Sequence, residues 1–161
     1  MTVDERVDFL VKSLDMLPHP EGGFYKETYR STEDLDTKNG KRSLCTVIYF
    51  LLRSADVSRF HRIQSDEHWF WHEGSPVTIH LLQKNAHVKL PLGPADKGRQ
   101  FPQQLVKAQT IFGSTVDQPD SYALVSCVVA PGFDFRDFEL FNTEQLLEKY
   151  PTEEEIIRRL T

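Results

Sequence analysis

Phe60-His61-Arg62-Ile63-Gln64-Ser65-Asp66-Glu67-His68-Trp69-Phe70-Trp71-His72-Glu73-Gly74 is the stretch that decides the fold of this chain. His61 lies six positions before Glu67, and six residues separate Glu67 from Gly74. Side chains alternate along a strand, which places His61 on the same face as Ile63 and Glu67 on the same face as two tryptophans. The stretch therefore predicts two strands, each presenting one titratable side chain among apolar neighbours.

The sequence on both sides of this stretch is typical of a β-rich protein with helical ends. From Glu21 to Val129, short runs rich in Val, Ile, Tyr and Phe alternate with clusters of Gly, Pro, Asn and Asp, which predicts many short antiparallel strands. Segments 4–17 and 143–161 have apolar residues at helical spacing. Thr2 and Glu5 fit a capping box for the first helix.

Length, composition and charge limit the classes of protein. The chain has 161 residues, of which 39% are hydrophobic, so we expect one domain over residues 1–161. Its net charge is -5 and it has no long run of Lys or Arg, which argues against nucleic acid as a partner. The charged start and the lack of a long apolar run predict a cytoplasmic protein without membrane contact.

Segment 46–52 is apolar on both strand faces, so both faces must be shielded from water. Val47, Tyr49 and Leu51 alternate there with Thr46, Ile48, Phe50 and Leu52. One face can line the interior of a barrel, and the other needs a second layer. A homodimer would supply that layer and is our expectation. The alternative is that the terminal helices supply it within one chain.

Three blocks in the same order resemble cupin family 5, a family of small single-domain cupins of unassigned function. The blocks are residues 17–31, the pairing of Phe60-His61-Arg62 with Ser65-Asp66-Glu67-His68-Trp69, and residues 129–140. The resemblance covers nearly the whole chain. It implies an all-β fold with flanking N-terminal and C-terminal α-helices, namely a double-stranded β-helix (jelly roll), usually dimeric, with a pocket open at one end.

The resemblance also bears on cofactors. Many cupins bind a metal ion through three His and one Glu, and His61 and Glu67 match two of these positions. The other two hold Ile63 and Phe112, whose side chains cannot bind a metal. We therefore expect no metal cofactor. More distantly, the chain resembles the dTDP-sugar epimerases, cupins that work without metal through a His base and a Tyr acid.

His61 and Glu67 are the first candidate catalytic residues. A histidine in a dry pocket can serve as a general base near neutral pH, although a hydrogen-bonded core His is the alternative. Glu67 beside indole rings becomes a general acid if burial raises its pKa, or a structural anchor if Arg59 pairs with it. Trp69 is a candidate stacking surface for a planar ligand, with a core role as its alternative.

The segment Pro20-Glu21-Gly22-Gly23-Phe24-Tyr25 supplies the next candidates. Its paired glycines permit positive φ or close backbone approach. We expect Tyr25 to be a proton donor, with Phe24 as a further ligand contact. Glu21 and Arg30 are candidates for orienting a ligand or for contacting a second subunit.

The segment after Pro131-Gly132 offers a partner for His61. Asp134 is a candidate catalytic residue that would orient His61 by accepting a hydrogen bond from its ring, and Asp137 is the alternative. Strand alternation cannot choose between them because the backbone after Pro-Gly need not be regular.

Two functional classes follow from these residues. The first is a metal-independent acid–base isomerase or epimerase acting on a small polar, sugar- or nucleotide-like substrate. His61 would be its base, Tyr25 or Glu67 its acid, and an Arg would hold the anionic part. The second is a small-ligand-binding or sensory module with the same pocket and no turnover. An open His61 beside a carboxylate favours the first class, and a His61 enclosed by aromatic rings favours the second.

Overall fold

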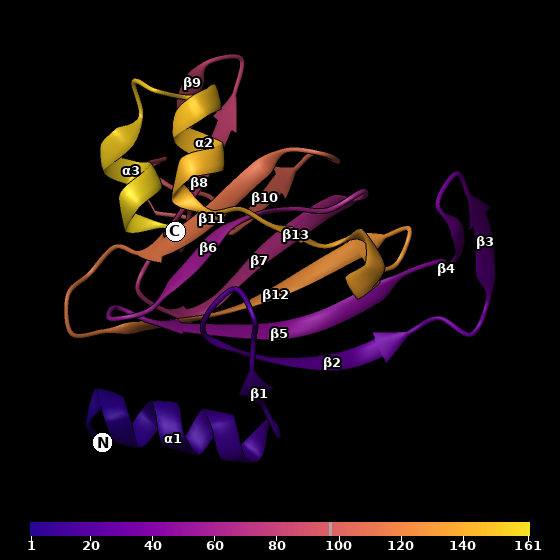
Figure 1. Ribbon diagram of the computed structural model, residues 1–161. Helices are drawn as coiled ribbons and strands as arrows, with labels where there is room; N and C mark the ends of the chain where they lie inside the picture. Colours follow the sequence, from indigo (N-terminus) through magenta and orange to yellow (C-terminus); the bar gives the residue numbers. More distant parts are fainter. Residues whose placement is uncertain (97) are drawn as a thin grey trace.

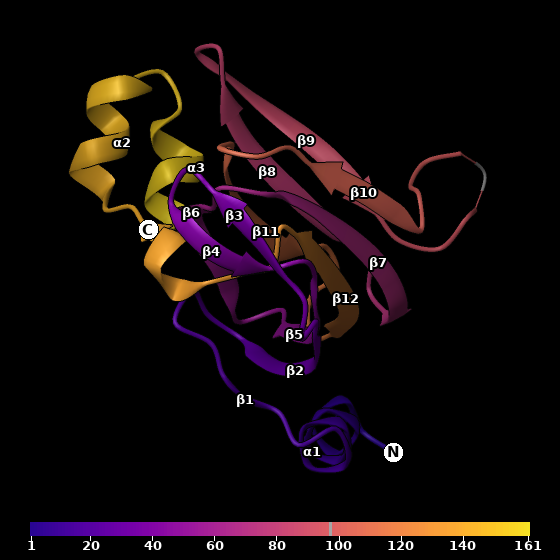
Figure 2. The same cartoon turned by 90° about the vertical axis from the view of Figure 1, so that its right-hand side faces the viewer.

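Two antiparallel sheets curve around a common interior in the computed structural model, which describes residues 1–96 and 98–161 (Figures 1 and 2). One sheet has the order β1-β2-β5-β12-β7-β10 and the other β13-β6-β11-β8-β9. The strands are β1 (Leu17–Pro18), β2 (Phe24–Arg30), β3 (Asp34–Thr37), β4 (Gly40–Ser43), β5 (Thr46–Arg53), β6 (Val57–Arg62), β7 (Asp66–Gly74), β8 (Val77–Gln83), β9 (Ala86–Leu92), β10 (Gln103–Val106), β11 (Ile111–Val116), β12 (Tyr122–Ala130) and β13 (Glu139–Leu140). β3 and β4 pair only with each other, as a hairpin that projects from the body (Figure 1).

The strand order confirms the jelly roll expected from the sequence. β12 lies between β5 and β7, and β11 lies between β6 and β8, so each sheet interleaves strands from early and late in the chain. The inward faces of both sheets meet in one apolar core that includes Phe50, Trp69, Ile79 and Phe112. Trp71 packs against the same core.

The N-terminal helix covers part of the outer face of the six-stranded sheet. α1 (Val3–Ser13) begins at the expected capping box, in which Thr2 and Glu5 exchange hydrogen bonds. It ends four residues before the predicted end because Asp15 adopts φ 52 and Leu17 pairs with Tyr25 in β1–β2. Its apolar side packs on that sheet, in the cluster Val7, Leu10, Met16, Leu51 and Leu124.

The C-terminal helices cover the outer face of the other sheet. α2 (Thr143–Lys149) and α3 (Glu154–Arg159) follow the short η1 (Phe135–Asp137) and β13. Leu146, Ile157 and Leu160 pack there against Phe60 and Leu82. Terminal helices thus cover a large part of both outer faces, as one of the two sequence interpretations proposed, while the centre of the six-stranded sheet keeps half-buried apolar residues such as Val47 and Tyr49.

The paired glycines let the turn between β1 and β2 lie directly on β6. Gly22 adopts φ 119, and a Cβ at this position would lie 2.0 Å from the carbonyl oxygen of Val57. The amide of Arg59 donates to the carbonyl of Glu21 at 2.8 Å. Only glycine permits both this conformation and this approach, and the result is that Glu21 is held above the barrel interior.

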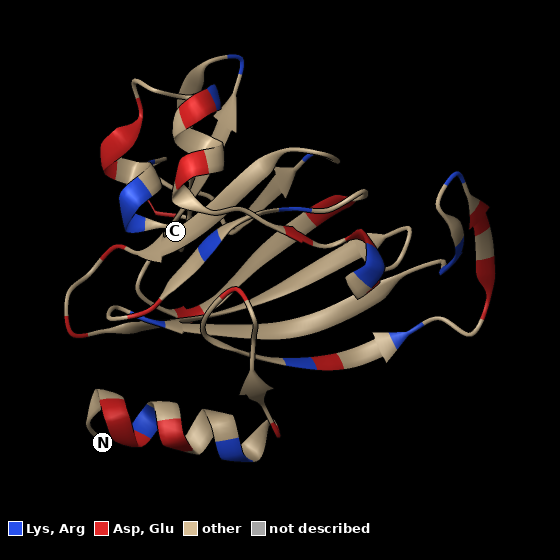
Figure 3. Cartoon of the chain, viewed as in Figure 1, with Lys and Arg blue, Asp and Glu red and all other residues tan. Residues whose placement is uncertain are grey.

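Charged residues lie mainly on the outside of the molecule. Residues of both charges occur along α1, β2 and the C-terminal helices (Figure 3). Among the described residues, no helix has the length and apolar character needed to cross a membrane.

Candidate functional site

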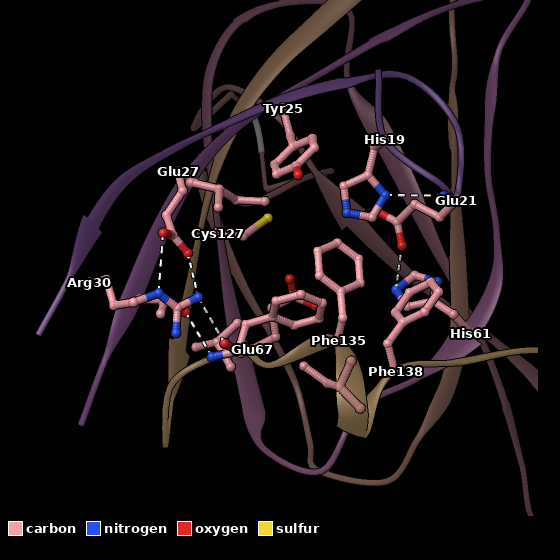
Figure 4. A pocket seen from close by; sticks show the side chains of 15 residues that line it. His19, Glu21, Tyr25, Glu27, Arg30, His61, Glu67, Cys127, Phe135 and Phe138 are labelled. Atoms are coloured by element: carbon pink, nitrogen blue, oxygen red, sulfur yellow. Dashed lines mark hydrogen bonds and ion pairs between the residues drawn. The ribbon is translucent and has the colours of Figure 1, made fainter. Parts of the chain in front are cut away.

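One end of the barrel holds a cavity of about 230 Å³ beneath the turn that carries Glu21. Figure 4 shows a Glu21–His61 contact at one side, a Glu27–Arg30 contact at the other, and the Cys127 sulfur between them. The cavity is lined by the polar residues His19, Glu21, Tyr25, Glu27, Arg30, Thr46, His61, Glu67 and Cys127 and the apolar residues Ile48, Ile63, Val129, Phe133, Phe135 and Phe138.

Glu21 and His61 form a buried pair at the inner wall. Nε2 of His61 lies 2.7 Å from Oε2 of Glu21, and both side chains are less than a tenth exposed. Nδ1 of His61 lies 2.6 Å from the carbonyl oxygen of Arg59. Because a carbonyl oxygen only accepts, Nδ1 carries a proton. Both ring nitrogens are therefore engaged, and the ring has no free lone pair facing the cavity.

The charges of this pair stabilise each other. Burial disfavours a charged His61, but the Glu21 carboxylate outweighs it and raises the pKa of His61. Burial likewise disfavours a charged Glu21, but His61 outweighs it and lowers the pKa of Glu21. The pair is thus an imidazolium beside a carboxylate.

Glu67 lies in the same cavity, but its surroundings raise its pKa, whereas those of Glu21 lower the pKa of Glu21. Its side chain projects inward from β7 and is 8% exposed. Burial, together with the nearby Glu21 carboxylate, raises the pKa of Glu67 to about 7. Burial of the Cys127 thiol beside Glu67 raises the pKa of that thiol as well. At neutral pH the Glu21 carboxyl is therefore ionised, whereas the Glu67 carboxyl in the same cavity is partly protonated.

His19 completes the polar wall. The backbone amide of Glu21 donates to Nδ1 of His19 at 3.1 Å, which leaves the proton of a neutral ring on Nε2. Burial lowers the pKa of His19, so the ring is neutral near pH 7. It packs edge-on against Tyr25 with ring centroids 4.7 Å apart.

The mouth of the cavity is aromatic and held by ion pairs. Phe138 stacks on His61 with ring centroids 5.4 Å apart, and Phe135 of η1 is 50% exposed. Arg30 donates to Glu27 at 2.6 Å and to the carbonyl of Phe133 at 3.0 Å, which ties β2 to this segment.

The structure brings five of the nine sequence-predicted site residues to the cavity, namely His61, Glu67, Tyr25, Glu21 and Arg30. Arg30 reaches it because the β2–β5 register shifts between Glu27 and Tyr29, so strict alternation fails there. The neighbouring Tyr29 is 54% exposed.

The predicted partner of His61 is wrong. Asp134 caps η1 and pairs with Arg136 at 2.7 Å, and Asp137 pairs with the buried Arg42 at 2.8 Å. Each of these two carboxylates is thus paired with an arginine. The carboxylate that contacts His61 is Glu21.

Trp69, Phe24 and Arg59 do not line the cavity. Trp69 occupies the next inward position on β7 after Glu67 and packs edge-on against Phe50 in the core. Phe24 faces the α1 cluster on the outside of the sheet. Arg59 donates to the carbonyls of Pro20 and Glu21, so it fixes the turn and does not pair with Glu67.

Sequence reasoning assigned no site role to His19, Glu27, Cys127 or the phenylalanines of the mouth. For two of these residues, the sequence did indicate a position near the site. His19 lies two positions before Glu21 in the glycine turn, and Glu27 lies two positions after Tyr25 on its strand face. Cys127 and Phe138 had no such signal because an apolar strand and an irregular segment look the same whether or not a cavity adjoins them.

The side chains at the expected ligand positions do not match the metal ligands of metal-binding cupins. Ile63 lines the cavity where a second His would stand, and Phe112 lies opposite His61 on β11 with ring centroids 4.2 Å apart. Nε2 of His61 is engaged by Glu21. Within residues 1–96 and 98–161, no three His, Cys, Asp or Glu side chains are arranged to hold a metal ion.

Comparison with known proteins gives consistent matches over most of the chain. The family model described as "Cupin superfamily (DUF985)" matches residues 8–141. A hypothetical protein from Leishmania major has 38% identity and a TM-score of 0.89, over 96% of this chain and 97% of that one. A protein from Shewanella oneidensis has 41% identity and a TM-score of 0.88, over 96% of each chain. An uncharacterized protein of Saccharomyces cerevisiae is 26% identical over 86% of this chain and 77% of its own length.

Proposed function

Since this chain belongs to the cupin superfamily family DUF985, we propose that its barrel cavity binds a small polar molecule and catalyses proton transfer on it, as in an isomerase or epimerase. The observation that carries the proposal is the presence of two carboxyl groups in one cavity whose pKa values are shifted in opposite directions. Such divergence is a frequent mark of a general base beside a general acid.

Glu21 is the base and Glu67 the acid in this proposal. Glu21 is ionised and its second oxygen is free of His61, so it can remove a proton from a substrate carbon. Glu67, with a pKa of about 7, can deliver a proton near neutral pH. His61 has no free lone pair and acts as a positioning residue that holds the Glu21 carboxylate and its charge. Tyr25 remains an alternative acid, since its side chain lines the same cavity.

The proposed chemistry uses no metal. Hydrocarbon side chains occupy two of the positions at which metal-binding cupins carry ligands, and the available histidine is engaged with Glu21. Proton removal and return need only the two carboxyl groups and a carbon whose C–H bond is activated by a neighbouring carbonyl.

Isotope exchange tests this proposal without knowledge of the natural substrate. We expect wild-type protein in D₂O to exchange a C–H proton of at least one member of a panel of small sugars and hydroxyketones, followed by proton NMR. Glu21→Gln and Glu67→Gln should each slow the exchange by about 10²–10⁴-fold, the usual contribution of one acid or base. Glu148→Gln, on the exposed side of α2, should leave it unchanged.

A non-catalytic ligand-binding module is the second candidate, and one observation favours it. The ring of His61 lies between Phe112 and Phe138, at centroid distances of 4.2 and 5.4 Å, so it is enclosed by aromatic rings as well as paired with a carboxylate. A panel member that binds in the cavity with no isotope exchange, in wild type as in the variants, would establish this second function and exclude the first.

We also propose that the protein is a homodimer through the outer face of the six-stranded sheet. α1 covers the Leu51 end of β5, and Tyr49 packs at the edge of that cluster. The cross-strand register places further half-buried or exposed apolar residues beyond Tyr49 on this face, namely Tyr29, Val47, Phe70 and Val128. A contiguous apolar face of this kind is unusual on a monomer.

Light scattering after size exclusion checks the dimer. We expect twice the chain mass of 18.7 kDa, and a shift to the monomer mass for Tyr49→Glu, because a charge would be buried at the interface. Glu148→Arg, on the exposed side of α2, should keep the dimer mass. A monomeric wild type at micromolar concentration would contradict the proposal.

A further inference from the structure

The charges that line the cavity are already balanced by one another. The Glu21 carboxylate faces the His61 imidazolium at 2.7 Å. At the rim, the Arg30 guanidinium is committed to Glu27 and to the carbonyl of Phe133. Arg30 and His61 are the only charged cations among the described lining residues. A ligand that carried a phosphate or carboxylate would therefore meet no free positive charge and would lie close to a carboxylate.

The remaining polar groups at the cavity are hydrogen-bonding groups without a fixed charge. The Glu67 carboxyl lies beside the Trp69 indole and the Cys127 thiol, and it faces the cavity together with the Tyr25 side chain. The buried indole N–H of Trp69, below the cavity, has Glu67 as its polar neighbour, so the free side of the Glu67 carboxyl is directed to the cavity. Buried polar groups are nearly always satisfied in native proteins, so a ligand that accepts hydrogen bonds would complete this site.

The remaining lining is apolar and the space is small. Aliphatic and aromatic side chains contribute Ile48, Ile63, Val129, Phe133, Phe135 and Phe138. The volume of about 230 Å³ lies below the range of roughly 300–1,000 Å³ that is typical of sites for drug-sized ligands. A complete nucleotide diphosphate sugar would not fit inside, and its diphosphate would have no cation to bind.

We propose that the natural ligand is a small uncharged molecule whose carbonyl or hydroxyl oxygen accepts a hydrogen bond from Glu67, with its apolar part against the phenylalanines of the mouth. This inference rests on the proposed function, because it takes the cavity as the ligand site. It narrows the substrate to neutral sugars and small carbonyl compounds, and it leaves nucleotide-linked and other anionic substrates out.

Three probes of nearly equal shape and different charge test the proposal: benzamide, benzoate and benzamidine. We expect benzamide to bind to wild-type protein at pH 6 at least 10-fold more tightly than either ion, as measured by ligand-detected NMR. Its affinity should fall as pH rises through about 7, because Glu67 then loses the proton that it donates.

The pH dependence must be assigned to Glu67 because several titratable groups share its surroundings. Those that influence Glu67 are Glu21 in the turn after β1, His61 on β6 and Cys127 on β12. Glu67→Gln keeps a donor at this position, so the variant should bind benzamide with no decrease in affinity between pH 6 and 8. Glu144→Gln, at an exposed position of α2, should retain the wild-type decrease.

Each other outcome overturns the inference. Tightest binding of benzoate would indicate an anion site, and tightest binding of benzamidine, increasing with pH, would indicate a cation site. Equal affinities, or no binding of any probe, would also contradict it. Failure of the catalytic proposal is distinguishable, since it would appear as selective benzamide binding by a protein that exchanges no substrate proton.

Discussion

Glu21→Ala should lower the free energy of unfolding by about 3–5 kcal/mol, the usual cost of removing one partner from a buried ion pair. The substitution leaves the His61 imidazole buried, with Nδ1 still bonded to the carbonyl of Arg59 and no acceptor at Nε2. Denaturant titration near pH 6 measures the change directly.

Two further variants separate the ion pair from simple loss of packing. Glu21→Gln should cost only about 1–2 kcal/mol, because its amide can donate to Nε2 of a neutral His61. Glu27→Ala removes a carboxylate from the exposed pair with Arg30 and should cost less than about 1 kcal/mol. A Glu21→Ala variant that costs no more than Glu27→Ala would show that the buried pair does not stabilise the fold.

The contribution of the pair also has a defined pH window. The pKa of Glu21 is lowered from 4.5, so its contribution is present above pH 4.5 and is lost as pH falls through the folded-state pKa. The pKa of His61 is raised from 6.5, so its contribution is present below pH 6.5 and is lost as pH rises through the folded-state pKa. The stability difference between wild type and Glu21→Ala should therefore be largest between pH 4.5 and 6.5.

Glu67→Gln should stabilise the protein at high pH by up to about 3 kcal/mol. The pKa of Glu67 rises from 4.5 in the unfolded chain to about 7 in the fold, since burial opposes its charge. Its stabilising contribution is complete below pH 4.5 and is lost as pH rises, and the loss is complete once pH exceeds about 7. Gln has nearly the same shape and never ionises, so the variant avoids this loss.

The measurement is the difference in free energy of unfolding between the variant and wild type from pH 4.5 to 8. We expect the difference to grow with pH and to become constant above about pH 7. Glu144→Gln, on the exposed side of α2, should give a flat difference over the same range. A flat difference for Glu67→Gln would show that the Glu67 carboxyl is not held in a dry cavity. Together with loss of isotope exchange, the stabilisation would mark Glu67 as a group whose position serves function at the expense of stability.

Most of the fold could be predicted from the sequence because it depends on local pattern. Alternating apolar runs indicated the strands, and the resemblance of three blocks to cupin family 5 implied the jelly roll. Thr2 and Glu5 identified the start of α1. The end of α1 was missed because the positive φ of Asp15 and the pairing of Leu17 with β2 are not encoded in helical spacing.

The site was predictable only where strand alternation holds. It grouped His61 with Ile63 on one strand face, and both residues line the cavity, as does Glu67 on the next strand. It could not place Arg30, because the β2–β5 register shifts before that residue. It also could not show where the cavity ends, so Trp69 was assigned to a ligand although it packs in the core below.

The strands, the terminal helices and the glycine turn follow from the sequence, because hydrophobic periodicity and paired glycines act over short stretches of chain, and the resemblance to a known family implied the barrel. Only the tertiary structure decided that Glu21 contacts His61 across 40 positions and that Asp134 and Asp137 are held by arginines instead. These contacts join residues from distant segments, which meet only once the β1–β2 turn has closed over the end of the barrel. Burial and neighbouring charge in that closed site then set the pKa values of Glu21, His61 and Glu67.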